Sequence, residues 1–336
     1  LPRRRDGGMD LQVFACFVEH TVSANDRAAQ VHRMLDAIEE VVVTNGESLA
    51  FARNTAEIEK NRSAGKISVV TAIENGLAIE NSLENLKRFH DRGVRLLTLA
   101  HNTSSDWCIS SADPSPAFDG LTDFGREVVR TMDELGMIVD VSHVHPCGVA
   151  AVLTVSKRPV IASHSCVHAI CPHQRNLTDE QIKAIAATGG MIGINFLGDF
   201  LSPSWREASE SFIKVHFETG RKWWNLFVDE CSAEEYAARR AELQPFLDAW
   251  ERQVRATGLD VGGVVDHIDH IVALVGPDHV GLGSDFDGIT FAPNGLEDCT
   301  RVPRLHEELE RRRYNPENLS KVMGGNFLRV FREVSG

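Results

Sequence analysis

Short apolar runs alternate along this chain with longer stretches in which apolar residues recur at helical spacing. Strands that alternate with helices in this way are typical of βα units around a parallel sheet. Seven runs rich in Val, Ile and Leu have the length of strands, at residues 11–18, 67–74, 94–101, 137–143, 159–164, 191–196 and 279–285. The pattern therefore predicts an α/β fold of the (β/α)8 TIM-barrel type, one visible strand short of closure.

The segments between the strands carry recognisable helix starts. Thr178 and Gln181 have the spacing of a capping box, and Ser232 and Glu235 repeat that spacing. Pro316 suits a first helical turn, because proline lacks the N–H that has no helical partner there. We expect helices to begin at these three places.

The strand–helix rhythm breaks near residues 200–260, where polar and aromatic residues replace a short connection. No linker rich in Gly, Ser or Pro flanks this segment. We interpret it as a helical insertion on the barrel, and we expect residues 1–336 to form a single domain.

Composition and charge exclude several classes of protein. The 336 residues carry a formal net charge of −13, whereas nucleic-acid binding needs a basic surface that releases counterions. No apolar run approaches the roughly 20 residues that span a bilayer. The seven cysteines are thinly spread and odd in number, which favours reduced thiols and a cytoplasmic location. We therefore expect no nucleic-acid partner and no membrane span.

Five of the apolar runs end on an ionisable side chain, namely Glu74, His101, His143, His164 and Asp285. The carboxyl ends of parallel barrel strands converge on one face, where active sites are built. Burying such groups together is costly unless something pairs them, and a metal ion pairs carboxylates with imidazoles. Glu74, His143 and His164 suit zinc, which lowers the pKa of a bound water toward about 7. The alternative is that these groups only hydrogen-bond loops at the barrel mouth.

Two other clusters resemble metal sites but favour a different interpretation. The stretch "CVHAICPH" at 166–173 holds two Cys and two His too densely for the usual structural zinc spacings. In "VVDHIDHIVAL" the apolar residues recur with helical period. That period predicts that His267 and Asp269 lie on the solvated face of a helix.

The motifs that surround the strand ends resemble one known family. They are "AIENG" at Glu74, "LLTLAHN" at His101, "VDVSHV" at His143, "PVIASHS" at His164, "QRN" at Arg175 and "GLGSDFDG" at Asp285, followed by "GGNFLRVF". In order and distance they resemble the membrane dipeptidase (renal dipeptidase) family of zinc peptidases, which has an amidohydrolase-like barrel. The likeness runs nearly end to end.

The resemblance implies a binuclear zinc centre. Glu74 would bridge two zinc ions, and His143 and His164 would complete the second. The family's first strand ends in His-x-Asp, which supplies the remaining ligands of the first zinc, and the only His-x-Asp here is the one at His267. Because this chain opens with the "LP" that follows the motif in the family, we expect those ligands and the first strand upstream of Leu1. Otherwise Glu74, His143 and His164 would hold at most one metal ion.

The resemblance also implies roles for three further residues. His101 would bind near the scissile carbonyl and stabilise the developing oxyanion, and Arg175 would hold the terminal carboxylate of the substrate. Asp285 would contact the substrate as well and carry a proton from a metal-bridging hydroxide or water to the leaving amine.

The expected function is zinc-dependent hydrolysis of dipeptides, which in this family commonly tolerates a D-residue at the C-terminal position. One alternative is a related amidohydrolase that acts on another small amide or a β-lactam. Another is a binding protein that has lost turnover, although a pure binder has no need of a proton carrier such as Asp285. The resemblance further implies a possible homodimer.

Overall fold

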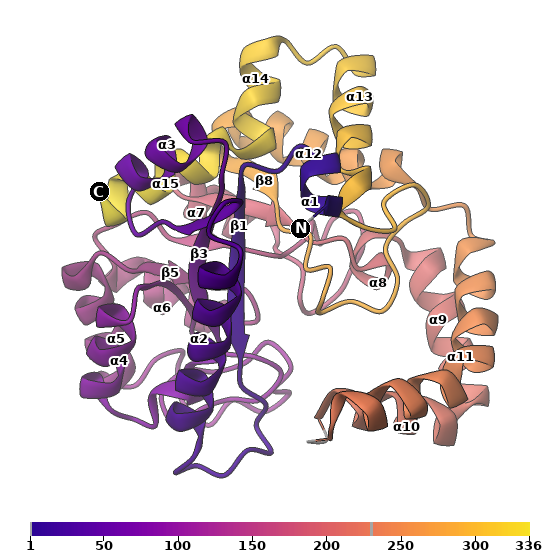
Figure 1. Cartoon of the computed structure of the whole chain (residues 1–336), viewed down its shortest axis with the longest axis horizontal. Helices are drawn as coiled ribbons and strands as arrows, with labels where there is room; N and C mark the ends of the chain where they lie inside the picture. Colours follow the sequence, from indigo (N-terminus) through magenta and orange to yellow (C-terminus); the bar gives the residue numbers. More distant parts are fainter. Residues whose placement is uncertain (1, 229–230) are drawn as a thin grey trace.

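A curled parallel sheet forms the centre of the protein (Figure 1). The computed structural model describes residues 2–228 and 231–336, without the side chains of residues 227 and 228, so Leu1 lies outside the described residues. The strands are β1 (Leu11–Phe17), β2 (Leu49–Phe51), β3 (Ile67–Glu74), β4 (Val94–Thr98), β5 (Ile138–Asp140), β6 (Ile161–Ala162), β7 (Met191–Ile194) and β8 (Val280–Leu282).

Seven of these strands form a continuous path in the order β1-β3-β4-β5-β6-β7-β8. Each of the seven predicted runs contains one of them, so the predicted α/β architecture is confirmed. Within residues 2–228 and 231–336, β8 and β1 are not paired, and the sheet is a curled half-barrel. The additional strand β2 pairs with the first residues of β3, on the same edge that β4 occupies farther along.

The inner face of the sheet has an apolar layer and, at the carboxyl ends of the strands, a polar layer. Residues two apart on a strand face the same side. The polar layer consists of Glu74, Thr98, Asp140 and Ser163, each two residues beyond a member of the apolar layer. In the apolar layer the strand residues Val70, Ala72, Leu96, Ile138, Ile161 and Met191 pack against Val330, Phe331 and Val334 of the C-terminal helix.

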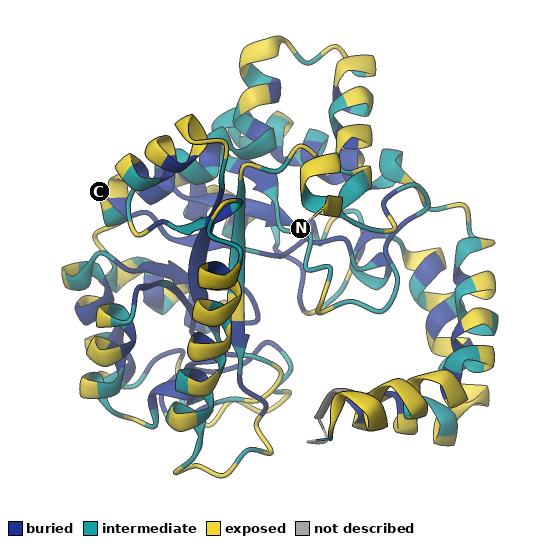
Figure 2. Ribbon diagram, viewed as in Figure 1, coloured by how far each residue is buried: buried dark blue, intermediate teal, exposed yellow. Residues whose placement is uncertain are grey.

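Helices cover the outer face of the sheet. This explains the uninterrupted burial of β3, since strands covered on both faces read as continuous apolar runs. Figure 2 shows the buried sheet inside helices whose outward faces are exposed. The helices are α1 (Pro2–Asp6), α2 (Arg27–Thr44), α3 (Thr55–Ser63), α4 (Leu83–Asp91), α5 (Asp123–Leu135), α6 (Pro146–Val155), α7 (Asp179–Ala187), α8 (Gly198–Leu201), α9 (Pro203–Val215), α10 (Phe217–Val228), α11 (Ala233–Arg255), α12 (Val261–Val275), α13 (Pro303–Arg311), α14 (Pro316–Ser320) and α15 (Asn326–Ser335).

The expected helix starts are confirmed. Thr178 and Gln181 form a reciprocal capping box before α7, and Ser232 and Glu235 form one before α11. Pro316 occupies the first turn of α14, which Asn315 caps.

The helical insertion consists of α9, α10 and α11, which form an arm at the side of the sheet (Figure 1). Trp223, Leu226, Leu243 and Leu247 make a small core between α10 and α11. Phe291, from the segment that follows β8, packs against this core. The arm therefore contacts the rest of the protein through that segment.

One prediction about α12 is wrong. Residues 261–275 form a helix, but His267 is 0% exposed rather than solvated. Its Nδ1 accepts a hydrogen bond from the Val167 amide (3.0 Å), and its Nε2 donates to the Leu201 carbonyl (3.0 Å). The loops after β6 and β7 fold over α12, which widens its buried stripe. Asp269 remains partly exposed, where it pairs with Arg312.

Within the described chain no helix is both long enough and apolar enough to cross a membrane. All seven cysteines are free thiols.

Candidate metal centre

Three side chains converge at the carboxyl ends of neighbouring strands. Glu74 is the last residue of β3, and His143 and His164 follow β5 and β6 by three and two residues. Glu74 Oε1 lies 3.3 Å from Nε2 of each imidazole, and the two Nε2 atoms lie 3.0 Å apart. In the described chain, this is the only group of three or more His, Cys, Asp or Glu residues whose potential metal-ligand atoms all lie within 4.8 Å of one another.

Hydrogen bonds at the far side of each ring determine which nitrogen faces the centre. His143 Nδ1 lies 3.2 Å from Oδ1 of Asn102, an atom that can only accept, so Nδ1 carries the proton. His164 Nδ1 lies 2.7 Å from Ser163 Oγ, whose own hydrogen goes to Asp140 Oδ2 at 2.5 Å. His164 Nδ1 therefore donates as well, and Nε2 of both neutral rings presents a lone pair to the centre.

This arrangement fits a metal ion. Two nitrogen lone pairs and a carboxylate oxygen that approach within 3.3 Å repel one another unless a cation lies among them. Imidazole and carboxylate are zinc ligands, and a ring N–H that donates to a neighbour is the usual support of a metal-bound His.

The charges of the centre agree with a cation at this point. Burial alone would raise the pKa of Glu74, but its contacts with His143 and His164 hold that pKa well below the usual range. Burial alone would lower the pKa of His164, but the hydrogen bond with Glu74 raises that pKa above its usual value. Burial, with Arg175 nearby, holds the pKa of His143 well below its usual value. Positive charge is thus favoured between Glu74 and His164.

His101 lies beside this centre. It follows β4 by three residues, and its ring centroid is 4.4 Å from that of His143 and 4.6 Å from that of Phe17. Burial lowers the pKa of His101, Glu74 and Glu19 oppose the shift, and Arg175 adds to it. The ring is therefore neutral at neutral pH and can donate one hydrogen bond to a ligand.

Arg175 is buried in the same region, with 5% of its surface exposed. Its guanidinium donates to the His164 carbonyl (3.2 Å) and packs against the ring of Phe200. Burial lowers its pKa to about 10, and the carboxylates of Glu74 and Asp285 oppose the shift. Its Nε has no hydrogen-bond partner among the described residues. A buried N–H without a partner is costly, so this atom is available to an anionic ligand.

Asp285 completes the set of predicted site residues. It follows β8 by three residues, and its Oδ2 accepts a hydrogen bond from Asn195 Nδ2 at 3.1 Å. Burial raises the pKa of Asp285 to about 6; His164 opposes this rise and Glu74 adds to it. A Cβ at Gly288 would lie 2.2 Å from Asp285 Oδ1, so the loop closes on the carboxylate only with glycine there.

The backbone is strained at two of these residues. His143 and Asp285 have φ angles of 67° and 56°, in the left-handed region that residues other than glycine rarely adopt. Such conformations cost roughly 1–3 kcal/mol each and cluster at functional sites. At both residues the strain redirects the side chain as the strand ends.

Sequence reasoning missed three residues that support the site: Asn102, Asp140 and Asn195. Asp140 is 0% exposed and accepts hydrogen bonds from Ser142, Ser163 and Thr98. The signal for Asp140 was an acidic residue inside the apolar run "MIVDVSH". The two asparagines carry no comparable signal, because asparagine is common in loops for other reasons.

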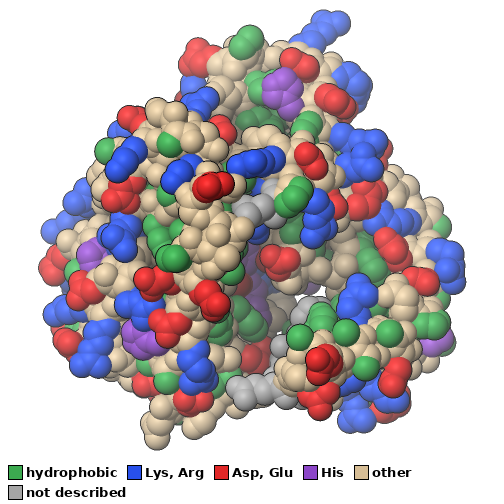
Figure 3. Space-filling model, viewed as in Figure 1, with side chains coloured by type: hydrophobic (Ala, Val, Ile, Leu, Met, Phe, Trp, Pro, Cys, Tyr) green, Lys and Arg blue, Asp and Glu red, His purple; other side chains and the backbone are tan. Residues whose placement is uncertain are grey.

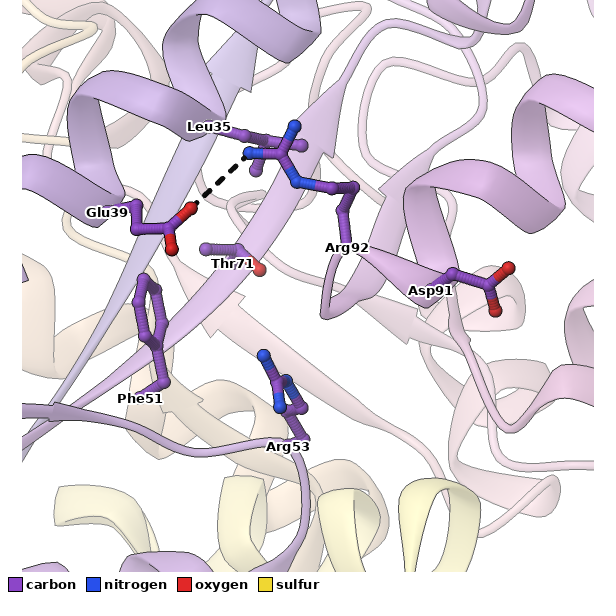
Figure 4. Close-up of a pocket in the computed structure, with 7 residues that line it drawn as sticks. All are labelled: Leu35, Glu39, Phe51, Arg53, Thr71, Asp91 and Arg92. Carbon is purple, nitrogen blue, oxygen red and sulfur yellow. Dashed lines mark ion pairs between the residues drawn. The ribbon is translucent and has the colours of Figure 1, made fainter.

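The molecule has two hollows, which differ in where they lie relative to the metal centre. Figure 3 shows the molecule hollowed between the curled sheet and the arm. A separate cavity of about 210 Å³ lies between α2, β3 and α4, and Arg53, Arg92 and Glu39 line it (Figure 4). Thr71, which also lines the cavity, lies at an outward position of β3, whereas Glu74 faces inward. The cavity therefore lies on the opposite face of the sheet from the metal centre.

Comparison with known proteins gives the following similarities. The family profile described as membrane dipeptidase (peptidase family M19) matches residues 1–336. Dipeptidase aclJ of Aspergillus oryzae is 29% identical over 341 residues, which cover 99% of this chain and 69% of that protein.

Two solved structures have a similar fold. The probable dipeptidase PvdM from Pseudomonas aeruginosa aligns with a TM-score of 0.83 at 24% identity, over 99% of this chain and 88% of that one. A metallopeptidase from Rhodobacter sphaeroides, liganded with a phosphinate mimic of the dipeptide L-Ala-D-Ala, aligns with a TM-score of 0.78 at 24% identity, over 99% of this chain and 89% of that one.

Proposed function

The chain belongs to the membrane dipeptidase family of metallopeptidases, and from this premise we propose that it hydrolyses dipeptides with zinc held by Glu74, His143 and His164. The family makes the protein a peptidase hydrolase. The observation that carries the proposal is the convergence of two imidazole lone pairs and one carboxylate oxygen on a single point. Glu74 would also help to hold a second zinc ion in a binuclear centre.

Zinc bound here would lower the pKa of a coordinated water and polarise the scissile carbonyl. The protein's own side chains would do the rest. His101, neutral and beside His143, would donate a hydrogen bond to the carbonyl oxygen as negative charge develops on it. Arg175 would hold the C-terminal carboxylate of the substrate, which its Nε without a partner supports.

Asp285 would carry the proton. A carboxyl group with a pKa of about 6 can accept a proton from the attacking water and return it to the leaving amine at neutral pH. Asn195 holds the carboxylate through Oδ2 and so orients it during both transfers.

We further propose that the protein accepts a D-residue at the C-terminal position. The structural neighbour that carries a mimic of L-Ala-D-Ala supports this choice of substrate.

Replacement of Asp285 by Asn tests the proposed mechanism. We expect Asp285→Asn to lower kcat on L-Ala-D-Ala by about 10²–10⁴-fold, because the proton carrier is lost, while the zinc content stays that of the wild type. The matched control is Asp287→Asn, which alters an exposed carboxylate two residues away and should leave kcat unchanged.

Steady-state kinetics and elemental analysis on the same samples provide the measurement. Unchanged turnover in Asp285→Asn would contradict the role of Asp285. A wild-type protein without activity on any dipeptide would contradict the function itself.

A further inference from the structure

One buried carboxylate at the mouth of the site has no role in the chemistry described above. Glu19 follows β1 by two residues and is 8% exposed. Within the described chain, no Lys or Arg lies within ion-pair distance of it, and its one ion-pair contact is the ring of His20. A buried carboxylate without a strong cationic partner is costly, so the site gains if a ligand supplies the positive charge.

The register of β1 places this carboxylate on the inner face of the sheet. Phe17 pairs with Glu74 in the parallel ladder, and paired residues face the same side. The contact between the rings of Phe17 and His101 agrees with this placement. Glu19 is two residues beyond Phe17 and so faces the same way, whereas Cys16 and Val18 are fully buried in the outer core.

The hydrogen bonds of Glu19 leave one oxygen available. Both the backbone amide and the ring Nδ1 of His20 contact Oε1. No described residue is hydrogen-bonded to Oε2. The contacts to Oε1 hold the carboxylate in place, and Oε2 can accept a hydrogen bond from a ligand.

Glu19 and Arg175 follow strands on opposite sides of β4, the strand that precedes His101. Along the sheet, Glu19 follows β1, Glu74 ends β3, His101 follows β4, and Arg175 follows the β6 strand end. Phe17, two residues before Glu19, packs against the ring of His101, and Arg175 donates to the carbonyl of His164. A dipeptide zwitterion has matching polarity, with a carboxylate at one end and an ammonium at the other.

We propose that Glu19 binds the free α-ammonium of the substrate's amino-terminal residue, so that the enzyme selects unacylated dipeptides. The inference rests on the proposed function. With the C-terminal carboxylate at Arg175 and the scissile carbonyl at Glu74, His143 and His164, the amino-terminal residue extends toward β1. Glu19 is the carboxylate on that side.

The test compares two substrates that differ only in the amine, L-Ala-D-Ala and propionyl-D-Ala. Wild-type kcat/KM should be higher for L-Ala-D-Ala, and Glu19→Gln should reduce that preference at least about tenfold without slowing hydrolysis of propionyl-D-Ala. Glu19→Asp keeps the charge and should retain part of the preference. The matched control is Glu84→Gln, which alters an exposed carboxylate on α4 that pairs with Arg88.

A second measurement uses only the wild-type protein. The α-amino group of a peptide loses its proton near pH 8. Relative to propionyl-D-Ala, kcat/KM for L-Ala-D-Ala should therefore fall as pH rises through about 8. A relative rate that rises across the same range would mean that the neutral amine is the bound form, which overturns the proposal.

The outcomes separate the two proposals. A wild-type protein that hydrolyses neither compound contradicts the proposed function. Hydrolysis of dipeptides with an unchanged substrate preference in folded Glu19→Gln overturns the role of Glu19 alone. If Glu19→Gln slowed only the hydrolysis of dipeptides with a Lys side chain, the role of Glu19 would also be overturned, because the cation that it binds would then be that side chain.

Discussion

Asp140 controls which nitrogen of His164 faces the metal centre. The carboxylate is fully buried; Oδ1 accepts the amide hydrogens of Ser142 and Ser163, and Oδ2 accepts the hydroxyl hydrogens of Thr98 and Ser163. Because the Ser163 hydroxyl donates to Asp140, its oxygen accepts from His164 Nδ1. A carboxylate two hydrogen bonds away from the His164 ring thus keeps Nε2 free of a proton.

We predict that Asp140→Asn lowers zinc affinity about 10–100-fold, the usual effect of losing a partner behind a metal-bound His. The amide would donate to Ser163, whose hydroxyl would then donate to His164 Nδ1 and place a proton on Nε2. Competition with a chromophoric chelator measures the affinity. Asp36→Asn, which alters an exposed ion pair with Arg92, is the control. Wild-type zinc affinity in Asp140→Asn would contradict this account of the tautomer.

Asp199 links stability to pH. Burial raises the pKa of this carboxyl to about 7, Ser209 and Arg206 oppose the rise, and Glu210 adds to it. The ordinary value is about 3.9, so between about pH 4 and 7 the native state binds a proton that the unfolded state does not. The free energy of unfolding therefore falls as pH rises through that window.

We predict that Asp199→Asn removes this pH dependence. At pH 8 the variant should exceed the wild type in free energy of unfolding by about 4 kcal/mol, and the difference should shrink as pH falls toward 5. Urea titrations at several pH values provide the measurement. Glu207→Gln, at an exposed position of α9, is the control. A difference that stays constant from pH 5 to 8 would exclude titration of Asp199 as the cause.

Among individual residues, the sequence predicted the ionisable groups of the site but not the residues that orient them. Glu74, His101, His143, His164 and Asp285 were predictable because a polar residue at the end of an apolar strand has few structural reasons to be there. Asn102 and Asn195 were not predictable, because their partners lie 41 and 90 residues away in the chain. Glu19 was missed because the predicted apolar run, residues 11–18, stops one residue before it.

At the scale of elements, the arm and the segment after β8 act as one unit. Trp250 of α11 packs edge to face on Phe291, with ring centroids 5.3 Å apart, and stacks on Phe212 of α9. Farther along, Arg255 donates to the side chain of Asn294 at 2.9 Å. Phe291 lies six residues after Asp285, so the arm supports the loop that carries the proposed proton carrier.

We predict that Trp250→Ala lowers kcat on L-Ala-D-Ala about tenfold while zinc affinity stays unchanged. Loss of the contact with Phe291 would loosen the loop, and small displacements of a reacting group reduce the rate strongly. The matched control is Trp224→Ala, since that side chain on α10 is 53% exposed. Equal kinetics of wild type and Trp250→Ala would show that the arm does not position Asp285.

The elements themselves were predictable to different degrees. The long apolar runs gave all seven strands of the main path, because strands buried on both faces are apolar throughout. The three-residue strand β2 was not predicted, since only its neighbour β3 makes those residues a strand. The prediction that His267 is solvated was wrong for a related reason, because the segments that cover α12 come from distant parts of the chain.

At the scale of the whole molecule, the fold separates stability from chemistry. The C-terminal helix α15 packs on the apolar layer of the inner face, and the ionisable groups lie at the carboxyl ends of the strands. Sequence patterns predicted that the ionisable groups meet at the carboxyl ends of the strands, which is general for parallel barrel strands, but not that α15 packs on the apolar layer. They did not predict the arm's placement, which depends on contacts between aromatic residues far apart in sequence.

We propose that a zinc ion on Glu74, His143 and His164 is required for dipeptide hydrolysis. To test this requirement, zinc is removed stepwise with a chelator. Bound zinc and turnover of L-Ala-D-Ala are measured on each sample. Turnover should fall with bound zinc and return when zinc is restored. Full turnover in zinc-free protein would contradict it.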